Sequence, residues 1–414
     1  MSHLAKHLSA ANHGGCLASA HGVPPVAANG TAMPASVCDP DRSPQGEAPP
    51  ERLRLSRLRR RLKQRGLDAL LVTQPENRRY LSGYTALDHG INESAGVLLI
   101  PAEGHPYLLT DGRYRLQAAE EAPDYQVRVY RQGLFALLRR LFNTLEPQRL
   151  AFESHYLLHS VYGSLEKLAG EKGLELVPFT DLVETQRQVK SQAELELIAE
   201  AVRLNEEVFT RVYRQLRPGV SEQETAWQIE DTMRRLGAEG PSFPTIVAAG
   251  PNGAKPHAVP TARKIAAGEP VIIDMGLRLD GYCSDMTRTV VLGQPDARTL
   301  ALIRLVRQAQ LAGQQALRAG VSGRFVDQVA RRVIAQAGYG DYFGHGLGHG
   351  VGLNVHEAPN LSHRNRKKLR SGMVLTVEPG VYLPDWGGVR LENMAVVTDE
   401  GCRILNRDTT FLDV

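Results

Sequence analysis

Residues 270–291 read Pro-Val-Ile-Ile-Asp-Met-Gly-Leu-Arg-Leu-Asp-Gly-Tyr-Cys-Ser-Asp-Met-Thr-Arg-Thr-Val-Val. Two strand-like stretches flank Asp280-Gly281, a dipeptide typical of two-residue β-hairpin turns. A hairpin with this turn sets Asp274 opposite Thr287 and places Asp274 and Asp285 diagonally on one face, with Cβ atoms ~7 Å apart or less. Two carboxylates at that distance repel each other unless a cation lies between them. Since Asp274 also follows three apolar residues, where an unpaired charge is costly, the hairpin predicts a cation site.

The chain contains an internal repeat that includes this hairpin. The segment Gly268–Gly276 is matched by Gly372–Gly380 in strand pattern, with a carboxylate at the same place in each. A helix start at Arg217–Ser221 is matched at Arg318–Ser322, just over 100 residues later. The shared order of helix, loop and carboxylate-bearing strand indicates a duplicated half-domain.

The second copy predicts a second pair of carboxylates. Glu378 ends an apolar strand, and Glu392 follows Val-Arg-Leu further along the chain. With a loop of about five residues around Pro384–Gly387, Glu378 and Glu392 face each other across a second hairpin. Each half of the duplication therefore presents an acidic pair.

A histidine-containing, glycine-rich stretch lies between the two pairs: Gly-His-Gly-Leu-Gly-His-Gly-Val-Gly-Leu-Asn-Val-His-Glu, residues 344–357. Glycine at every second position from 344 to 352 disfavours a helix and lets the backbone pass close to a ligand or an ion. Packing alone does not account for His345, His349 and His356 in such a stretch. His257 lies in the matching loop of the first half.

The residue types of this constellation suit divalent cations. Four carboxylates and one imidazole favour Mn²⁺, with Co²⁺ or Zn²⁺ as alternatives, over a metal that prefers thiolates. Two such cations ~3.5–4 Å apart can share a bridging water, lower its pKa toward ~7 and polarise the carbonyl that it attacks. The sequence therefore predicts two divalent metal ions per subunit and hydrolytic chemistry.

These motifs resemble those of the pita-bread metallopeptidases, the group of methionine aminopeptidase, prolidase and Xaa-Pro aminopeptidase (aminopeptidase P). The resemblance implies five metal ligands, which are Asp274, Asp285, His349, Glu378 and Glu392. The segment Thr110-Asp-Gly-Arg-Tyr114 is similar to the N-terminal domain of prolidase and aminopeptidase P, which methionine aminopeptidases lack. The resemblance also implies a homodimer in which the N-terminal domain of one subunit helps to shape the active site of its partner.

The same resemblance implies roles for individual residues. Asp274 would chelate one metal and His349 the other, while Asp285 and Glu392 would touch both. Glu378 would bind the second metal and act as general base. The expected substrate-binding residues are His257, His345, His356 and Arg390. His257 and His356 would also be catalytic, because they would stabilise the tetrahedral intermediate. His345 would lie near the proline, and Arg390 would orient Glu392 or its neighbours.

The predicted activity is hydrolysis of the peptide bond before proline by a metal-bridging hydroxide. That bond is a tertiary amide without an N–H group, and attack on its carbonyl does not require one. We expect release of the N-terminal residue from Xaa-Pro peptides. The alternatives are an Xaa-Pro dipeptidase (prolidase) and, in a different class, a non-enzymatic pita-bread binding protein.

The fold class expected from the whole chain is α/β (α+β), in three parts. Strands near 69–73, 96–100, 107–110, 126–130, 150–152 and 174–178 alternate with helices, which predicts an N-terminal creatinase/prolidase-like α/β domain over residues 51–185. Residues 186–414 then form the pita-bread metallopeptidase domain. Residues 1–50 hold seven of the 24 prolines and no aromatic residue, which is typical of a disordered tail.

Composition limits the setting in which the protein works. No apolar run approaches the ~18 residues of a membrane span, so we expect no membrane partner. A net charge of +4 is too small to indicate a nucleic-acid partner. Four cysteines without a Cys-x-x-Cys motif favour reduced thiols and a cytoplasmic location.

Overall fold

The computed structural model describes residues 49–407, in which two regions follow one another. The N-terminal region comprises residues 50–187 and the C-terminal region residues 192–404. The disordered tail that the sequence predicts over residues 1–50 lies outside the described residues, except for its last two.

The N-terminal region is built on one six-stranded sheet in the order β4-β3-β2-β1-β5-β6. Its strands are β1 (Ala69–Val72), β2 (Val97–Pro101), β3 (Tyr107–Thr110), β4 (Gln126–Val129), β5 (Arg149–Glu153) and β6 (Glu175–Phe179). Its helices are α1 (Pro50–Gln64), α2 (Pro75–Ser82), α3 (Arg115–Glu121), α4 (Leu134–Leu145), α5 (His159–Lys172) and α6 (Glu184–Arg187). The sheet is mixed, because β1–β5, β5–β6 and β3–β4 are parallel and the other pairs antiparallel.

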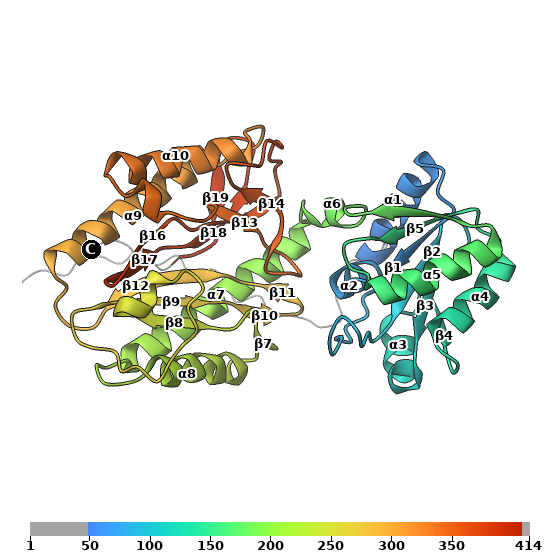
Figure 1. Ribbon diagram of the computed structural model, residues 1–414, viewed down its shortest axis with the longest axis horizontal. Coiled ribbons are helices and arrows are strands. Elements are labelled where there is room, and N and C mark those ends of the chain that lie inside the picture. The colour runs from blue at the N-terminus through green and yellow to red at the C-terminus, as the bar shows by residue number, and fades with distance from the viewer. Residues whose placement is uncertain (1–48, 408–414) are drawn as a thin grey trace, which may run out of the picture. The chain divides into compact units, whose positions relative to one another are not determined.

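Helices cover both faces of this sheet (Figure 1). Strand β1 fits this arrangement, because it is apolar at every position and its successive side chains point to opposite faces. Leu70 and Val72 pack in the same core as Leu58 of α1. Ala69 and Leu71 pack instead with residues of α4 and α5.

The C-terminal region repeats one arrangement of two helices and a sheet. The helices are α7 (Gln192–Gln215) and α8 (Glu222–Arg235) in the first half, and α9 (Ala297–Ala316) and α10 (Gly323–Gln336) in the second. Ser221 and Ser322 are the N-caps of α8 and α10, and each forms an isolated β-bridge with a lysine, Lys264 or Lys368. These equivalent contacts agree with the predicted duplication.

The strands of the C-terminal region form four sheets, and we call the two that contain more residues the larger sheets. The larger ones have the orders β12-β9-β8 and β14-β13-β15-β18-β19, and the smaller ones β11-β10-β7 and β16-β17. The bounds are β7 (Gly240–Pro241), β8 (Ile246–Ala249), β9 (Pro270–Met275), β10 (Leu277–Leu279), β11 (Tyr282–Cys283), β12 (Met286–Val291), β13 (Gly348–Gly350), β14 (Glu357–Leu361), β15 (Val374–Val377), β16 (Gly380–Leu383), β17 (Gly387–Arg390), β18 (Asn393–Val397) and β19 (Cys402–Ile404). The first larger sheet shares a core with α7 and α8, the second with α9 and α10 (Figure 1).

Both hairpins have the register that the sequence predicts. Asp274 pairs with Thr287 across β9 and β12, and the turn residues Asp280 and Gly281 have φ values of 47° and 78°, as the tight turn requires. In the second half, β16 and β17 pair from Gly380–Arg390 to Leu383–Gly387, so three residues connect them instead of the expected five. The register is unchanged, because Val377 pairs with Asn393 and Glu378 is therefore aligned with Glu392.

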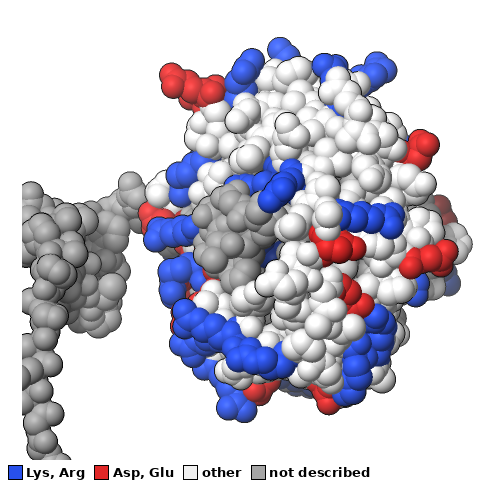
Figure 2. All heavy atoms as spheres, turned by 90° about the vertical axis from the view of Figure 1, so that its left-hand side faces the viewer, with Lys and Arg blue, Asp and Glu red and all other residues white. Residues whose placement is uncertain are grey.

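Charged side chains are mixed on the face of the C-terminal region that Figure 2 shows. Lysine and arginine side chains are spread round this face, and acidic side chains lie among them. No helix within residues 49–407 combines the length and the apolar character needed to cross a membrane.

Candidate active site

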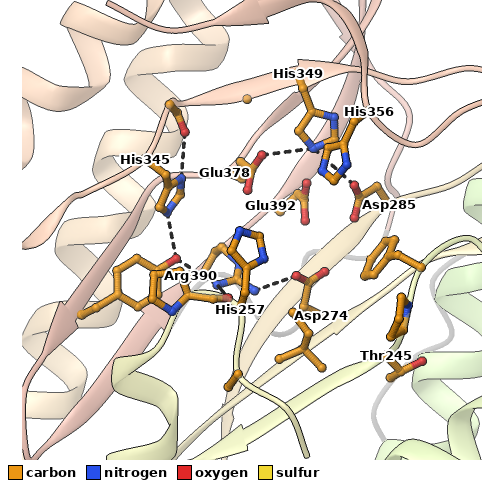
Figure 3. A pocket seen from close by; sticks show the side chains of 18 of the residues that line it. Thr245, His257, Asp274, Asp285, His345, His349, His356, Glu378, Arg390 and Glu392 are labelled. Atoms are coloured by element: carbon orange, nitrogen blue, oxygen red, sulfur yellow. Dashed lines mark hydrogen bonds and ion pairs between the residues drawn. The ribbon is translucent and has the colours of Figure 1, made fainter. Parts of the chain in front are cut away.

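All nine candidate residues line one cavity of about 570 Å³ (Figure 3). The first half contributes His257, Asp274 and Asp285, and the second half contributes His345, His349, His356, Glu378, Arg390 and Glu392. Residues up to 135 positions apart therefore meet in one place, as the duplication predicts.

The four carboxylates lie where strands of the two larger sheets begin or end. Asp274 is in β9 and Asp285 directly precedes β12, while Glu378 follows β15 and Glu392 precedes β18. Hydrogen bonds join the two halves here: the Glu392 backbone N–H donates to the carbonyl oxygen of Thr287 at 3.0 Å, and the Thr287 hydroxyl donates to Glu392 Oε2 at 2.8 Å. The edges of the two sheets thus hold both acidic pairs at one junction.

His349 in β13 completes a group with the geometry of a metal site. Its Nε2 lies 3.5 Å from Asp285 Oδ2 and 3.3 Å from Glu378 Oε1. Ligand atoms of Asp285, His349 and Glu392 all lie within 4.8 Å of one another. His349 Nδ1 lies 3.1 Å from the carbonyl oxygen of Gly350, which can only accept, so Nδ1 holds the proton and Nε2 presents its lone pair to the cavity.

The electrostatics of the cavity favour a bound cation. Burial, followed by repulsion from neighbouring carboxylates, raises the pKa of Asp285 and of Glu392 well above the usual range. Burial also lowers the pKa of His349, so its ring is neutral and able to bind a metal. Asp274 Oδ1 is buried without a hydrogen-bond partner among the described residues. Crowded carboxylates, a free imidazole nitrogen and an unsatisfied carboxylate oxygen fit divalent cations.

Arg390 contacts Asp274 directly. Its Nη2 donates to Asp274 Oδ2 at 2.6 Å and its Nε to the Thr287 hydroxyl at 3.1 Å. The sequence suggested that Arg390 orients Glu392 or its neighbours; Asp274 is such a neighbour, and the Thr287 hydroxyl also joins Arg390 to Glu392. One arginine cannot neutralise four carboxylates, which leaves the cavity acidic.

Two of the remaining histidines are neutral at neutral pH because partial desolvation lowers the pKa of each ring. Burial lowers the pKa of His345 to about 4 and, together with the neighbouring His349, that of His356 to about 4. His345 Nδ1 donates to the carbonyl oxygen of Gly346 at 2.8 Å, so its Nε2 accepts the Tyr382 hydroxyl at 2.9 Å. The rings of His349 and His356 meet edge to face, with centroids 4.4 Å apart.

The structure adds lining residues that sequence reasoning missed. Tyr382 accepts Arg390 Nη1 at 2.9 Å and so joins that arginine to His345. Its place in β16, next to the acidic hairpin, is a signal that could have identified it. The residues of the apolar wall carry no such signal of their own, although two of them directly follow His257; they are Phe243, Pro244, Ile246, Ala258 and Val259.

Clustered carboxylates and imidazoles drawn from two repeated halves are the residue types of a metal-dependent hydrolase. Residues 196–399 match the family Metallopeptidase family M24, and residues 54–189 match the Creatinase/Prolidase N-terminal domain. The chain belongs to metallopeptidase family M24 and is an enzyme of this peptidase family. The resemblance and the fold class predicted from the sequence are thereby confirmed.

Known relatives cover nearly the whole of the described chain. An Xaa-Pro dipeptidase of Pyrococcus horikoshii is 33% identical over 82% of this chain and 93% of its own length. Among solved structures, an Xaa-Pro dipeptidase from Bacillus anthracis is 36% identical with a TM-score of 0.81, covering 86% of this chain and 98% of that one. An X-Pro aminopeptidase from Thermotoga maritima is 35% identical with a TM-score of 0.76, covering 84% and 98%.

Proposed function

We propose that this enzyme is an Xaa-Pro dipeptidase, which splits dipeptides at the bond before proline. The sequence alone favoured an aminopeptidase that acts on longer Xaa-Pro peptides. The relatives from Pyrococcus horikoshii and Bacillus anthracis are named Xaa-Pro dipeptidases, and these names support the dipeptidase, although the Thermotoga maritima structure is named an X-Pro aminopeptidase. The observation that supports peptide hydrolysis is the position of all five predicted ligands on one cavity.

The residues proposed to hold two divalent cations are Asp274, Asp285, His349, Glu378 and Glu392, with Mn²⁺ the expected metal and Co²⁺ or Zn²⁺ as alternatives. Bound there, such cations supply a water of lowered pKa and polarise a carbonyl group. His349 fits this role through its free Nε2, and the carboxylates fit because each lies near at least one other anionic group.

Glu378 is proposed as the general base. Its Oε1 accepts the Thr376 hydroxyl at 3.1 Å, which holds the carboxylate in place beside His349. Burial raises the pKa of Glu378 above its usual range, so the group is a better proton acceptor than an exposed glutamate. A proton taken up at this carboxyl can be returned to the leaving proline nitrogen.

His257 and His356 are proposed to donate to the oxyanion that develops from the scissile carbonyl. Neither ring has a hydrogen-bond partner among residues 49–407, so an N–H of each remains available to the substrate. His345 differs, because both of its ring nitrogens are engaged by Gly346 and Tyr382. We assign His345 to shaping the wall of the pocket, and Arg390 to holding Asp274.

A peptide panel tests the proposal. Purified enzyme loaded with Mn²⁺ is given Ala-Pro, Ala-Pro-Ala and Ala-Ala, and the products are separated by chromatography. The proposal predicts rapid cleavage of Ala-Pro and little cleavage of the others. Faster cleavage of Ala-Pro-Ala would identify an aminopeptidase, and absence of both activities would refute Xaa-Pro hydrolysis.

A further inference from the structure

The segment between β13 and β14, residues 351–356, holds His356 in the cavity. Its first half is bonded to neighbouring strands: the Val351 N–H donates to the Val374 carbonyl at 3.1 Å, and the Gly352 carbonyl accepts the Cys283 N–H at 2.8 Å. Its second half depends on Asn354, since the Gly352 N–H donates to the Asn354 carbonyl at 3.0 Å and the His356 N–H donates to Asn354 Oδ1 at 3.1 Å. Asn354 is therefore the residue that fixes the backbone at His356.

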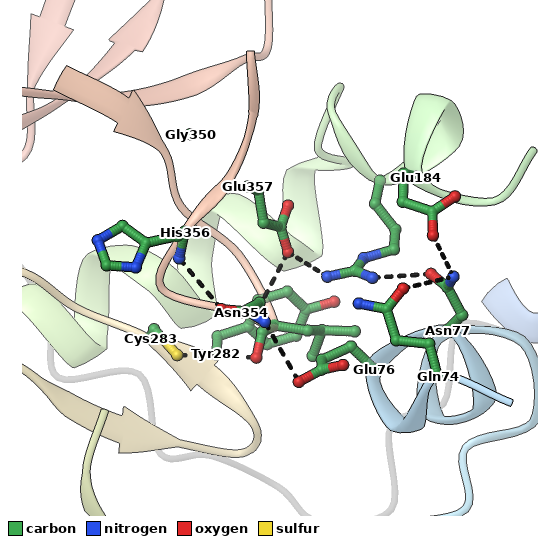
Figure 4. A network of polar contacts seen from close by, with 12 residues as sticks. Gln74, Glu76, Asn77, Glu184, Tyr282, Cys283, Gly350, Asn354, His356 and Glu357 are labelled. Atoms are coloured by element: carbon green, nitrogen blue, oxygen red, sulfur yellow. Dashed lines mark hydrogen bonds and ion pairs between the residues drawn. The ribbon is translucent and has the colours of Figure 1, made fainter. Parts of the chain in front are cut away.

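Glu357, the next residue, anchors this segment on the side away from the cavity (Figure 4). Its side chain is only 7% exposed and accepts Arg187 Nη2 at 2.5 Å, Lys190 Nζ at 3.2 Å and the Asn354 N–H at 3.1 Å. Gly352 leaves room for this carboxylate, since a Cβ there would lie 2.7 Å from both Glu357 oxygens. The Glu357 carboxylate thus contacts two cationic side chains, Arg187 and Lys190, and also Asn354, the residue that fixes His356.

Arg187 extends the contact into the N-terminal region. Its Nη1 donates to Asn77 Oδ1 at 2.7 Å, and Asn77 Nδ2 donates to Glu153 at 2.7 Å and to Glu184 at 2.6 Å (Figure 4). Asn77 is fully buried. A continuous series of polar contacts therefore runs from the N-terminal region to the backbone of His356.

Joining two regions does not by itself require such a network. Desolvation makes a buried ion pair no more stabilising, on average, than well-packed apolar residues of similar volume. A second pair, Arg54–Glu194, already connects α1 to α7. The Glu357 network differs from that pair because it reaches a residue of the active site.

We propose that Glu357, Arg187 and Asn354 are positioning residues, which hold His356 in the geometry needed for hydrolysis and make that geometry depend on the N-terminal region. The inference rests on the proposed function only in the role given to His356. Without Glu357 the second half of the segment, residues 354–356, loses its anchor, and His356 samples orientations from which it cannot reach the substrate.

The test compares Glu357→Gln with Glu194→Gln, a matched variant that weakens the Arg54–Glu194 ion pair between the regions. Both are purified with Mn²⁺, and metal content, melting temperature, kcat and KM for Ala-Pro are measured. We expect Glu357→Gln to lower kcat about 10- to 100-fold with KM and metal content little changed, as for residues that orient a functional group. Glu194→Gln should retain wild-type kcat.

A double-mutant cycle with His356→Ala separates positioning from general damage. If Glu357 acts through His356, Glu357→Gln has little further effect in the His356→Ala background. An equal loss in both backgrounds overturns the proposal, and so does a wild-type kcat in Glu357→Gln. If Glu357→Gln does not fold, Asn354→Ala is used in the same cycle, because it removes the link and leaves the ion pair intact.

Amide hydrogen exchange gives a readout that does not depend on activity. Residues 351–357 should exchange faster in Glu357→Gln than in wild type or Glu194→Gln, with no change in β9 or β12. Unchanged exchange in this segment overturns the proposal. If the wild-type enzyme cleaves no Xaa-Pro peptide, the proposed function fails, and hydrogen exchange still decides whether the network anchors His356.

Discussion

The carboxylates removed from solvent in this chain have two kinds of electrostatic environment, one that raises the carboxyl pKa and one that lowers it. Asp285, Glu392 and Glu378 face one another around a cavity, and burial raises their pKa values. Glu357 is equally buried, but the charges of Arg187 and Lys190 outweigh burial and lower its pKa to about 2. The first three carboxylates are suited to bind metal cations from solution, whereas Glu357 is neutralised by the cationic side chains of Arg187 and Lys190.

The pKa of Glu357 predicts a pH dependence of stability. Because the folded pKa of about 2 lies below the usual glutamate pKa of 4.5, the carboxylate contributes about 3 kcal/mol to stability above pH 4.5, and this contribution is lost as the pH falls toward 2. The advantage of wild type over Glu357→Gln in free energy of unfolding should therefore shrink by about 2 kcal/mol between pH 6 and pH 3. Urea unfolding of both proteins at a series of pH values measures this difference in free energy of unfolding. A constant difference would contradict the prediction.

Glu378 provides a second prediction at this scale. Glu378→Gln keeps the size of the side chain and removes its ability to accept a proton. We expect the melting temperature to stay near that of wild type while kcat falls about 10²- to 10⁴-fold, the usual contribution of a general base. The exposed Glu400→Gln serves as control and should be fully active. Near-normal turnover in Glu378→Gln would exclude it as the base.

At the scale of elements, the glycines of β13 are required by the close packing of this strand against its neighbours. The sequence suggested that they let the backbone approach an ion, but a Cβ on Gly348 would collide with the carbonyl oxygen of Thr376 in the neighbouring β15. Gly350 is similarly close to Ala358. His349 lies between these two glycines, so its position depends on the close contact of three strands.

A pair of glycine variants tests this requirement. Gly348→Ala forces β13 away from β15 and should lower the free energy of unfolding by about 1–3 kcal/mol or more, with loss of bound metal because His349 moves. Gly344→Ala is the control, since a Cβ there meets nothing within 4 Å. Thermal unfolding and elemental analysis measure both effects. Equal behaviour of the two variants would contradict this explanation.

Local signals determined how much of the fold could be predicted. The Asp280-Gly281 turn restricts the hairpin to one register, so the pairing of Asp274 with Thr287 followed from the sequence. The sequence did not predict helices α2 and α9, although proline begins α2 and Asp296 caps α9. The contact of Arg187 with Glu357 spans 170 residues, and no local pattern indicates it.

At the scale of the whole molecule, the cavity requires both halves of the C-terminal region, and a cation there should hold them together. We expect the melting temperature of chelator-treated protein to rise by several degrees with saturating Mn²⁺, since ligand at 100 times its Kd adds about 2.7 kcal/mol. Asp285→Asn should reduce both this rise and the bound metal. Asp280→Asn, in the turn of the same hairpin, should behave as wild type. An undiminished rise in Asp285→Asn would remove it from the site.

The order of the ligands along the chain has a consequence for biosynthesis. Asp274 and Asp285 leave the ribosome well before Glu378, and Glu392 follows Asp285 by 107 residues. A nascent polypeptide that ends between Asp285 and Glu378 therefore holds one acidic pair without the other. We expect a product terminated there to lack the proposed metal site, and so to bind no metal and cleave no peptide.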